Sequence, residues 1–141
     1  TINNRTNNMS FDINSLQLQD TTTLHLKNPA TEMPLYTGEK HDKPVEIVIY
    51  GRSSKQYRQW LSAAETAKAR RKNKEQSPEE KLADTVDFLA AITKEVRNIK
   101  IGETEVNNYE AIKAMYAAPG LVWIGDQVAN ALSEVDGFLQ S

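Results

Sequence analysis

Short runs of alternating apolar and polar residues mark the first third of the chain. They read Leu-Gln-Leu at 16–18 and Leu-His-Leu at 24–26, and a β-branched run, VEIVIY, follows at 45–50. Alternation with period two is typical of half-buried strands, and Asn28 and Gly38 fall in turn-forming dipeptides between the runs. The pattern therefore predicts a small N-terminal antiparallel sheet of two or three strands.

The spacing of apolar residues changes to a helical period after the third run. A first helix is expected from Ser53 or Ser54 to about Lys74, with Tyr57, Trp60, Leu61 and Ala64 on one face. A second helix is expected from Pro78 to about Asn98, ended by Gly102. Its start is a capping box, since Ser77 is followed three residues later by Glu80. Its apolar stripe comprises Leu82, Val86, Phe88, Leu89, Ile92 and Val96.

Two further helices are expected near the end of the sequence. Asn107 or Asn108 caps a short helix through Ala117, a Pro-Gly pair breaks the chain, and a last helix runs from about Leu121 to Leu139. The predicted fold class is α+β and mostly α-helical, with the small sheet followed by about four helices. We expect residues 9–141 to form one domain, β-rich over 9–51 and helical over 52–141, and we expect residues 1–8 to be a flexible upstream tail.

Composition narrows the classes of function. The chain has 141 residues, no cysteine and a formal net charge of −2, so it lacks thiolate metal sites, disulfides and a field that attracts nucleic acid or anionic membranes. No apolar run approaches the ~20 residues of a membrane helix. We therefore expect no membrane partner.

Candidate catalytic residues are sparse. His25 and His41 have no second histidine at metal-ligand spacing, and Gly51-Arg52-Ser53 lacks the second glycine of a nucleophile elbow. A turn and a helix cap explain the latter more simply. We expect a protein that is not an enzyme, with no catalytic residues, no metal site and no cofactor.

A basic run lies at 68–74, with five lysine or arginine residues. Such a run can neutralise phosphates, but it has no interleaved aromatic residues and acidic residues follow it closely. A solvated helix end is the favoured interpretation. A protein contact and a nucleic-acid contact are the alternatives, the latter disfavoured.

The last predicted helix begins with four consecutive apolar residues, Leu121–Ile124, which point in different directions around the helix. We do not expect one small core to bury all four. Trp and Tyr are favoured anchors of protein interfaces. We expect one face of the helix to complete the core, with Trp123, and another to meet a second chain, with Ile124 and Phe138. The expected partner-binding residues are Leu121, Trp123, Ile124, Val128, Leu132, Phe138 and Leu139.

Several of these features occur together in one known family. Lys27-Asn28-Pro29-Ala30-Thr31 follows the 24–26 run, Gly51 and Ser54 follow the 45–50 run, and Tyr116, Pro119, Trp123, Gln127, Val128 and Phe138 mark the C-terminal helices. This order over residues 16–139 resembles the tail assembly chaperones of long-tailed bacteriophages (siphoviruses).

The resemblance implies a protein–protein interaction in the host bacterial cytoplasm. Members of that family bind the helix-rich phage tape measure protein, keep it soluble during tail assembly and are absent from the mature virion. The tail tube protein and a second copy of the chain are further candidate partners. Two other functions stay open: a structural tail-completion or head–tail connector protein, and a nucleic-acid-binding regulator using residues 68–74.

Overall fold

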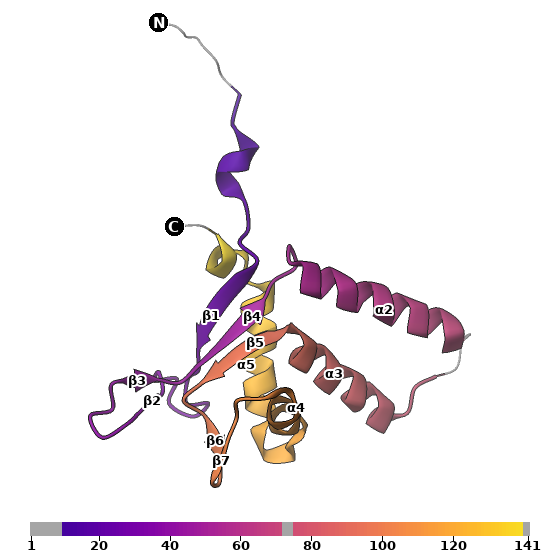
Figure 1. Ribbon diagram of the computed structural model, residues 1–141. Helices are drawn as coiled ribbons and strands as arrows, with labels where there is room; N and C mark the ends of the chain where they lie inside the picture. Colours follow the sequence, from indigo (N-terminus) through magenta and orange to yellow (C-terminus); the bar gives the residue numbers. More distant parts are fainter. Residues whose placement is uncertain (1–9, 72–74, 140–141) are drawn as a thin grey trace, which may run out of the picture.

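The computed structural model describes residues 10–71 and 75–139, in which a three-stranded antiparallel sheet carries helices on one face (Figure 1). The strands are β1 (Thr21–His25), β4 (Glu46–Tyr50) and β5 (Thr93–Arg97), with β4 in the centre. β4 confirms the strand predicted at 45–50. It takes the central place because its β-branched residues can be buried on both faces of the sheet.

The third strand, β5, corrects the expectation that the second long helix continues to Asn98. That helix, α3 (Pro78–Ile92), ends where Thr93 adopts an extended conformation, and the chain enters β5 without a loop. The Thr93 hydroxyl donates to the carbonyl oxygen of Leu89 at 2.7 Å. Pairing with the apolar β4 overrides helix propensity here, because Thr93 and Val96 are β-branched and suit a strand.

The strand predicted at 16–18 is not part of this sheet. Residues Ile13–Leu16 form a short 3₁₀ helix, η1, capped by the side chain of Asp12, and Leu18 makes an isolated bridge with Leu139. Figure 1 shows η1 projecting from the start of β1, away from the rest of the fold. Alternation alone was misleading because, among the described residues, this segment pairs through a single bridge and not with a strand of the sheet.

Two small hairpins extend from the other end of the sheet (Figure 1). One pairs β2 (Tyr36–Thr37) with β3 (Lys43–Pro44), and the other pairs β6 (Lys100–Ile101) with β7 (Thr104–Glu105). Gly102, expected to end a helix, lies instead in the turn of the second hairpin. Its φ of 61° lies in the left-handed region that glycine adopts without strain.

Four α-helices lie in the described part of the chain, which confirms the α+β, mostly helical fold class. They are α2 (Lys55–Arg71), α3, α4 (Tyr109–Ala117) and α5 (Val122–Ser133). The predicted caps are confirmed: Ser54 accepts a hydrogen bond from Tyr57 N–H, Ser77 forms a capping box with Glu80, and Asn108 caps α4. Residues 1–8 and Lys74 lie outside the described ranges.

The last helix is shorter than expected. A 3₁₀ turn, η2 (Pro119–Leu121), precedes α5, which ends before Glu134 adopts an extended conformation. A second 3₁₀ turn, η3 (Val135–Phe138), then returns the chain to β1. There the Thr22 hydroxyl donates to the Gly137 carbonyl at 2.6 Å, and Gln19 N–H donates to the Phe138 carbonyl at 2.6 Å. Interactions with β1 therefore replace the final helical turns.

The hydrophobic core lies between one face of the sheet and the helices α3, α4 and α5. From β4, Ile47 and Ile49 enter it and are fully buried. Met115 of α4 and Val128 of α5 meet them from the helical side. Figure 1 shows α5 crossing behind the sheet, so one side of the sheet is covered.

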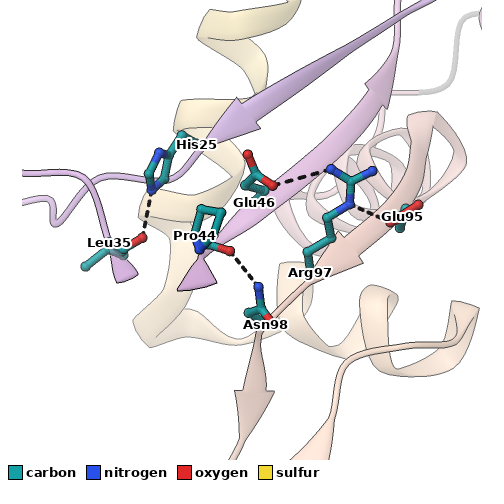
Figure 2. Close-up of polar contacts among 7 residues, drawn as sticks. All are labelled: His25, Leu35, Pro44, Glu46, Glu95, Arg97 and Asn98. Carbon is teal, nitrogen blue, oxygen red and sulfur yellow. Dashed lines mark hydrogen bonds and ion pairs between the residues drawn. The ribbon is translucent and has the colours of Figure 1, made fainter. Parts of the chain in front are cut away.

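The opposite face of the sheet carries polar side chains. Arg97 on β5 donates from Nε to Glu95 at 2.6 Å and from Nη1 to Glu46 of β4 at 3.3 Å (Figure 2). Hydrogen bonding to Arg97 lowers the pKa of Glu95, and the same pairing raises the pKa of Arg97. Antiparallel sheets commonly carry polar residues on the face away from the core, and here Val48 of β4 lies among them and is buried.

Candidate protein-interaction surfaces

The expected orientation of Ile124 and Phe138 is wrong. Their side chains are 3% and 4% exposed, so neither faces outward, and Val128 is also buried. The helical phase that aligned the two residues does not apply, because Phe138 belongs to η3 rather than to α5. Of the other expected partner-binding residues, Leu121, Trp123 and Leu132 are half-buried against the core, and Leu139 is half-buried where it bridges to Leu18.

Phe138 packs directly over Gly51, at the end of β4. A Cβ atom at Gly51 would lie 2.5 Å from Cε1 of the Phe138 ring, closer than any side chain tolerates. The next residues complete the turn: Ser54 donates from its hydroxyl to the Gly51 carbonyl at 2.6 Å, and Ser53 donates to Gln19. The serines near Gly51 therefore hold a turn and a helix cap, as predicted.

Gln127 of α5 connects the helical part to the turn at residues 27–31. Its side-chain amide accepts a hydrogen bond from Lys27 N–H at 3.0 Å and donates one to the Lys27 carbonyl at 2.8 Å. In the turn itself, the Asn28 carboxamide oxygen accepts from the backbone N–H of Ala30 and Thr31. Two pairs of the residues that carry the family resemblance therefore contact each other, Gly51 with Phe138 and Lys27 with Gln127.

The histidines occupy structural or solvated positions. The Nε2 atom of His25 lies 2.7 Å from the Leu35 carbonyl oxygen (Figure 2). The His25 ring also meets the Tyr36 ring edge-on. His41 is exposed in the turn of the first hairpin. Across residues 10–71 and 75–139, no group of three or more His, Cys, Asp or Glu side chains is arranged to hold a metal ion. Nor does any helix there combine the length and hydropathy of a membrane span.

One buried hydroxyl pair lies among the core residues. The Tyr116 hydroxyl lies 2.6 Å from Oγ1 of Thr93, and both side chains are buried. Burial raises the pKa of Tyr116 to about 12, and the hydrogen bond with Thr93 partly opposes this increase. The tyrosine is therefore a neutral structural group at ordinary pH.

Helix α2 is the least buried long element of the fold. None of its described residues is buried, and it contacts α3 mainly through aromatic rings. The Trp60 ring centre lies 4.4 Å from that of Phe88, and Tyr57 lies 6.0 Å from the same ring. Figure 1 shows α2 lying beside α3, to one side of the sheet, and Leu61 of α2 is 41% exposed.

A groove runs between α2 and α3. We call it the α2–α3 groove; its volume is about 420 Å³, and Trp60, Phe88 and three alanines of α2 line it. Arg71 crosses it to meet Asp84, with Nη2 and Oδ2 3.6 Å apart. Arg71 is thus used inside the fold, whereas Lys68 and Arg70 of the basic run are exposed and Lys72 and Lys74 lie outside the described residues.

A second groove runs between α3 and α4. This α3–α4 groove has a volume of about 560 Å³ and is lined by Glu79, Leu82, Ala83, Val86, Asp87, Glu110, Lys113, Ala114 and Ala117. Leu82 was expected on the core stripe with Val86 and Leu89, yet it is 54% exposed. The stripe pattern did not reveal this, because α4 is short and covers only part of α3.

A third apolar surface lies on the segment that precedes β1. Phe11, Ile13 and Leu16 are 67%, 72% and 57% exposed, and they lie on or beside η1. Sequence reasoning assigned this segment to the sheet and missed its exposure. The missed signal is Asp12, a helix-capping residue placed between two apolar residues.

The chain was compared with protein-family models, with curated proteins and with solved structures, and none of the three comparisons found a match.

Proposed function

We propose that this chain is a non-enzymatic tail assembly chaperone of a long-tailed bacteriophage. In this proposal it binds the tape measure protein in the host cytoplasm and keeps it soluble until the tail tube forms around it. The observation that supports the proposal best is the pair of open, largely apolar grooves on either side of α3. Grooves between helices are a common way to bind an amphipathic helix of another protein.

A chaperone for a long helical client needs two properties on one molecule. It needs apolar surface that the client can cover, and enough charge to stay dissolved while that surface is exposed. The grooves supply the first property, with Trp60, Leu82 and Phe88 in their walls. Charged residues make up 26% of the sequence and supply the second.

The positions of the residues that carry the family resemblance suggest that they maintain the fold and that other residues contact the client. Gln127 holds the turn at Lys27, and Phe138 packs on Gly51, so these residues maintain the fold. Client contacts would then come from the exposed residues on the α2–α3–α4 side of the molecule, such as Leu82. The tail tube protein and a second copy of the chain are further candidate partners of the same surfaces.

Quantitative mass spectrometry of infected cells and purified virions tests the proposal. We expect the chain to be abundant in infected cells before tails are complete and to be missing from purified particles. A fixed number of copies in each virion would instead support the structural alternative, a tail-completion or head–tail connector protein. A capsid protein and a known assembly-only protein from the same infection provide the two reference points.

A further inference from the structure

The α3–α4 groove lacks the aromatic contact that joins the two helices of the α2–α3 groove. In the α2–α3 groove, the ring centres of Trp60 and Phe88 lie 4.4 Å apart with their planes tilted by 50°. Each groove is crossed by one ion pair, but the α3–α4 groove has no aromatic residue in its lining, which includes Ala83, Ala114 and Ala117. Small side chains let a further helix approach closely, and the exposed Leu82 offers it an apolar contact.

The charges on the α3–α4 groove are mainly negative. Glu79, Asp87 and Glu110 contribute carboxylates, and Lys113 contributes the one ammonium group among its lining residues. Lys113 is committed to Asp87, with Nζ and Oδ1 3.0 Å apart, and this hydrogen bond raises the pKa of Lys113. Glu79 and Glu110 form no ion pair with any residue of the described ranges. Glu110 also acts electrostatically on Lys113 and helps to raise its pKa. Both Glu79 and Glu110 are exposed, so both carboxylates can meet a partner.

We propose that the α3–α4 groove binds an amphipathic α-helix whose apolar stripe is flanked by lysine or arginine residues. Apolar residues spaced three and four apart would cover Leu82 and the alanines, and the flanking cations would meet Glu79 and Glu110. This inference rests on the proposed function, since it identifies the occupant as a helical segment of the client. It adds the location of the site and the charge that the segment must carry.

Two synthetic helical peptides test the charge requirement directly. They share one stripe of leucine and alanine, and the flanking positions carry lysine in one peptide and glutamate in the other. Fluorescence anisotropy with the full chain should show the lysine peptide binding about tenfold or more tightly, and added salt should reduce the difference. Equal affinity of the two peptides for the parent chain would overturn the proposal without any variant.

Variants then place the binding on this groove. Leu82→Asp should weaken binding of the lysine peptide about tenfold or more, and Glu79→Lys with Glu110→Lys should reverse the preference between peptides. The matched control is Glu65→Lys with Glu103→Lys, because these exposed residues lie outside the groove and their replacement changes the net charge equally. Circular dichroism should show that each variant keeps the parent fold. If the control variant reversed the preference between the two peptides as strongly, the net charge of the chain and not the groove would decide which peptide binds.

Capture of the full-length tape measure protein distinguishes an error in the groove assignment from an error in the proposed function. If the parent captures it but Leu82→Asp and the Glu79/Glu110 variant capture it equally well, the groove assignment is wrong and the proposed function stands. If the folded parent fails to capture it, the proposed function is wrong, whatever the peptides show. Capture by the parent that both variants lose supports both.

Discussion

The side-chain amide of Gln127 forms two hydrogen bonds with the backbone of Lys27, which lies 100 residues earlier in the chain. One bond satisfies the Lys27 N–H and the other its carbonyl, as a neighbouring strand would. The contact fixes α5 against the turn that follows β1. It connects the N-terminal part of the fold to the last α-helix through backbone hydrogen bonds.

Replacement of Gln127 should destabilise the fold. Gln127→Ala removes both hydrogen bonds, each of which contributes roughly 0.5–1.5 kcal/mol, so we expect a loss of about 1–3 kcal/mol in the free energy of unfolding. Urea denaturation followed by circular dichroism measures it. Asn130→Ala, one turn further along α5 on an exposed position, is the matched control and should change little. Equal effects of the two substitutions would show that the paired hydrogen bonds contribute nothing.

Gly51 should tolerate no side chain while Phe138 keeps its position. Gly51→Ala places a methyl group against the Phe138 ring, and overpacking of this kind typically costs about 1–3 kcal/mol. Combining it with Phe138→Leu should give less than the sum of the two single losses, because the ring that clashes is gone. Thermal unfolding of the four proteins of this cycle tests it. Gly120→Ala, with no atom near the added methyl group, serves as the control.

The capping box at the start of α3 supports a third prediction. Ser77 accepts a hydrogen bond from Glu80 N–H at 3.2 Å, and the Glu80 carboxylate accepts one from Ser77 N–H at 3.2 Å. Ser77→Ala should lower the free energy of unfolding by about 1 kcal/mol, as is typical for the loss of a serine cap. Ser62→Ala, on the exposed side of α2, should be neutral. An unchanged urea midpoint for Ser77→Ala would contradict the prediction.

Tyr116 predicts how stability responds to alkaline pH. Its pKa in the folded chain is about 12, compared with about 10 for an unfolded tyrosine, so folding favours the protonated phenol. The stabilisation of the fold by the protonated Tyr116 phenol is therefore fully present below about pH 10 and is lost as the pH rises through about 12. Tyr116→Phe should be less stable at neutral pH by about 1 kcal/mol, from the lost hydrogen bond with Thr93.

The measurement is the urea midpoint of the parent and of Tyr116→Phe at several values between pH 8 and 12. The stability of the parent should fall more steeply, so that the gap between the two proteins narrows. Tyr109→Phe provides the control, since Tyr109 is exposed. Parallel curves for parent and Tyr116→Phe would show that this phenol does not couple folding to pH.

Features set by local sequence were predicted well. The helix starts at Ser54, Ser77 and Asn108 follow from side chains that cap the helix two or three residues later, and β4 follows from a run of β-branched residues. Interactions of this kind lie within a few residues, so they leave a signature in the sequence.

Features set by distant partners could not be predicted in the same way. β5 is a strand because β4 lies beside it, and η1 is not one because no strand does. The same reason explains the candidate site. Ile124 and Phe138 were expected to face outward, but both are buried, and Phe138 is placed by the return of η3 to β1. Leu82 was expected in the core, but it is exposed because the short helix α4 covers only part of α3.

The central claim is that this chain keeps a helical client in solution through the helices around α3. Its most direct test is coexpression of the tape measure protein of the same phage with the tagged chain, with Leu82→Asp, or with neither, followed by separation of soluble from sedimented protein. We expect the tape measure protein to sediment alone, to become soluble and copurify with the parent chain, and to do so less with Leu82→Asp. A tape measure protein that sediments equally in all three cases, beside folded and abundant parent chain, would contradict the claim.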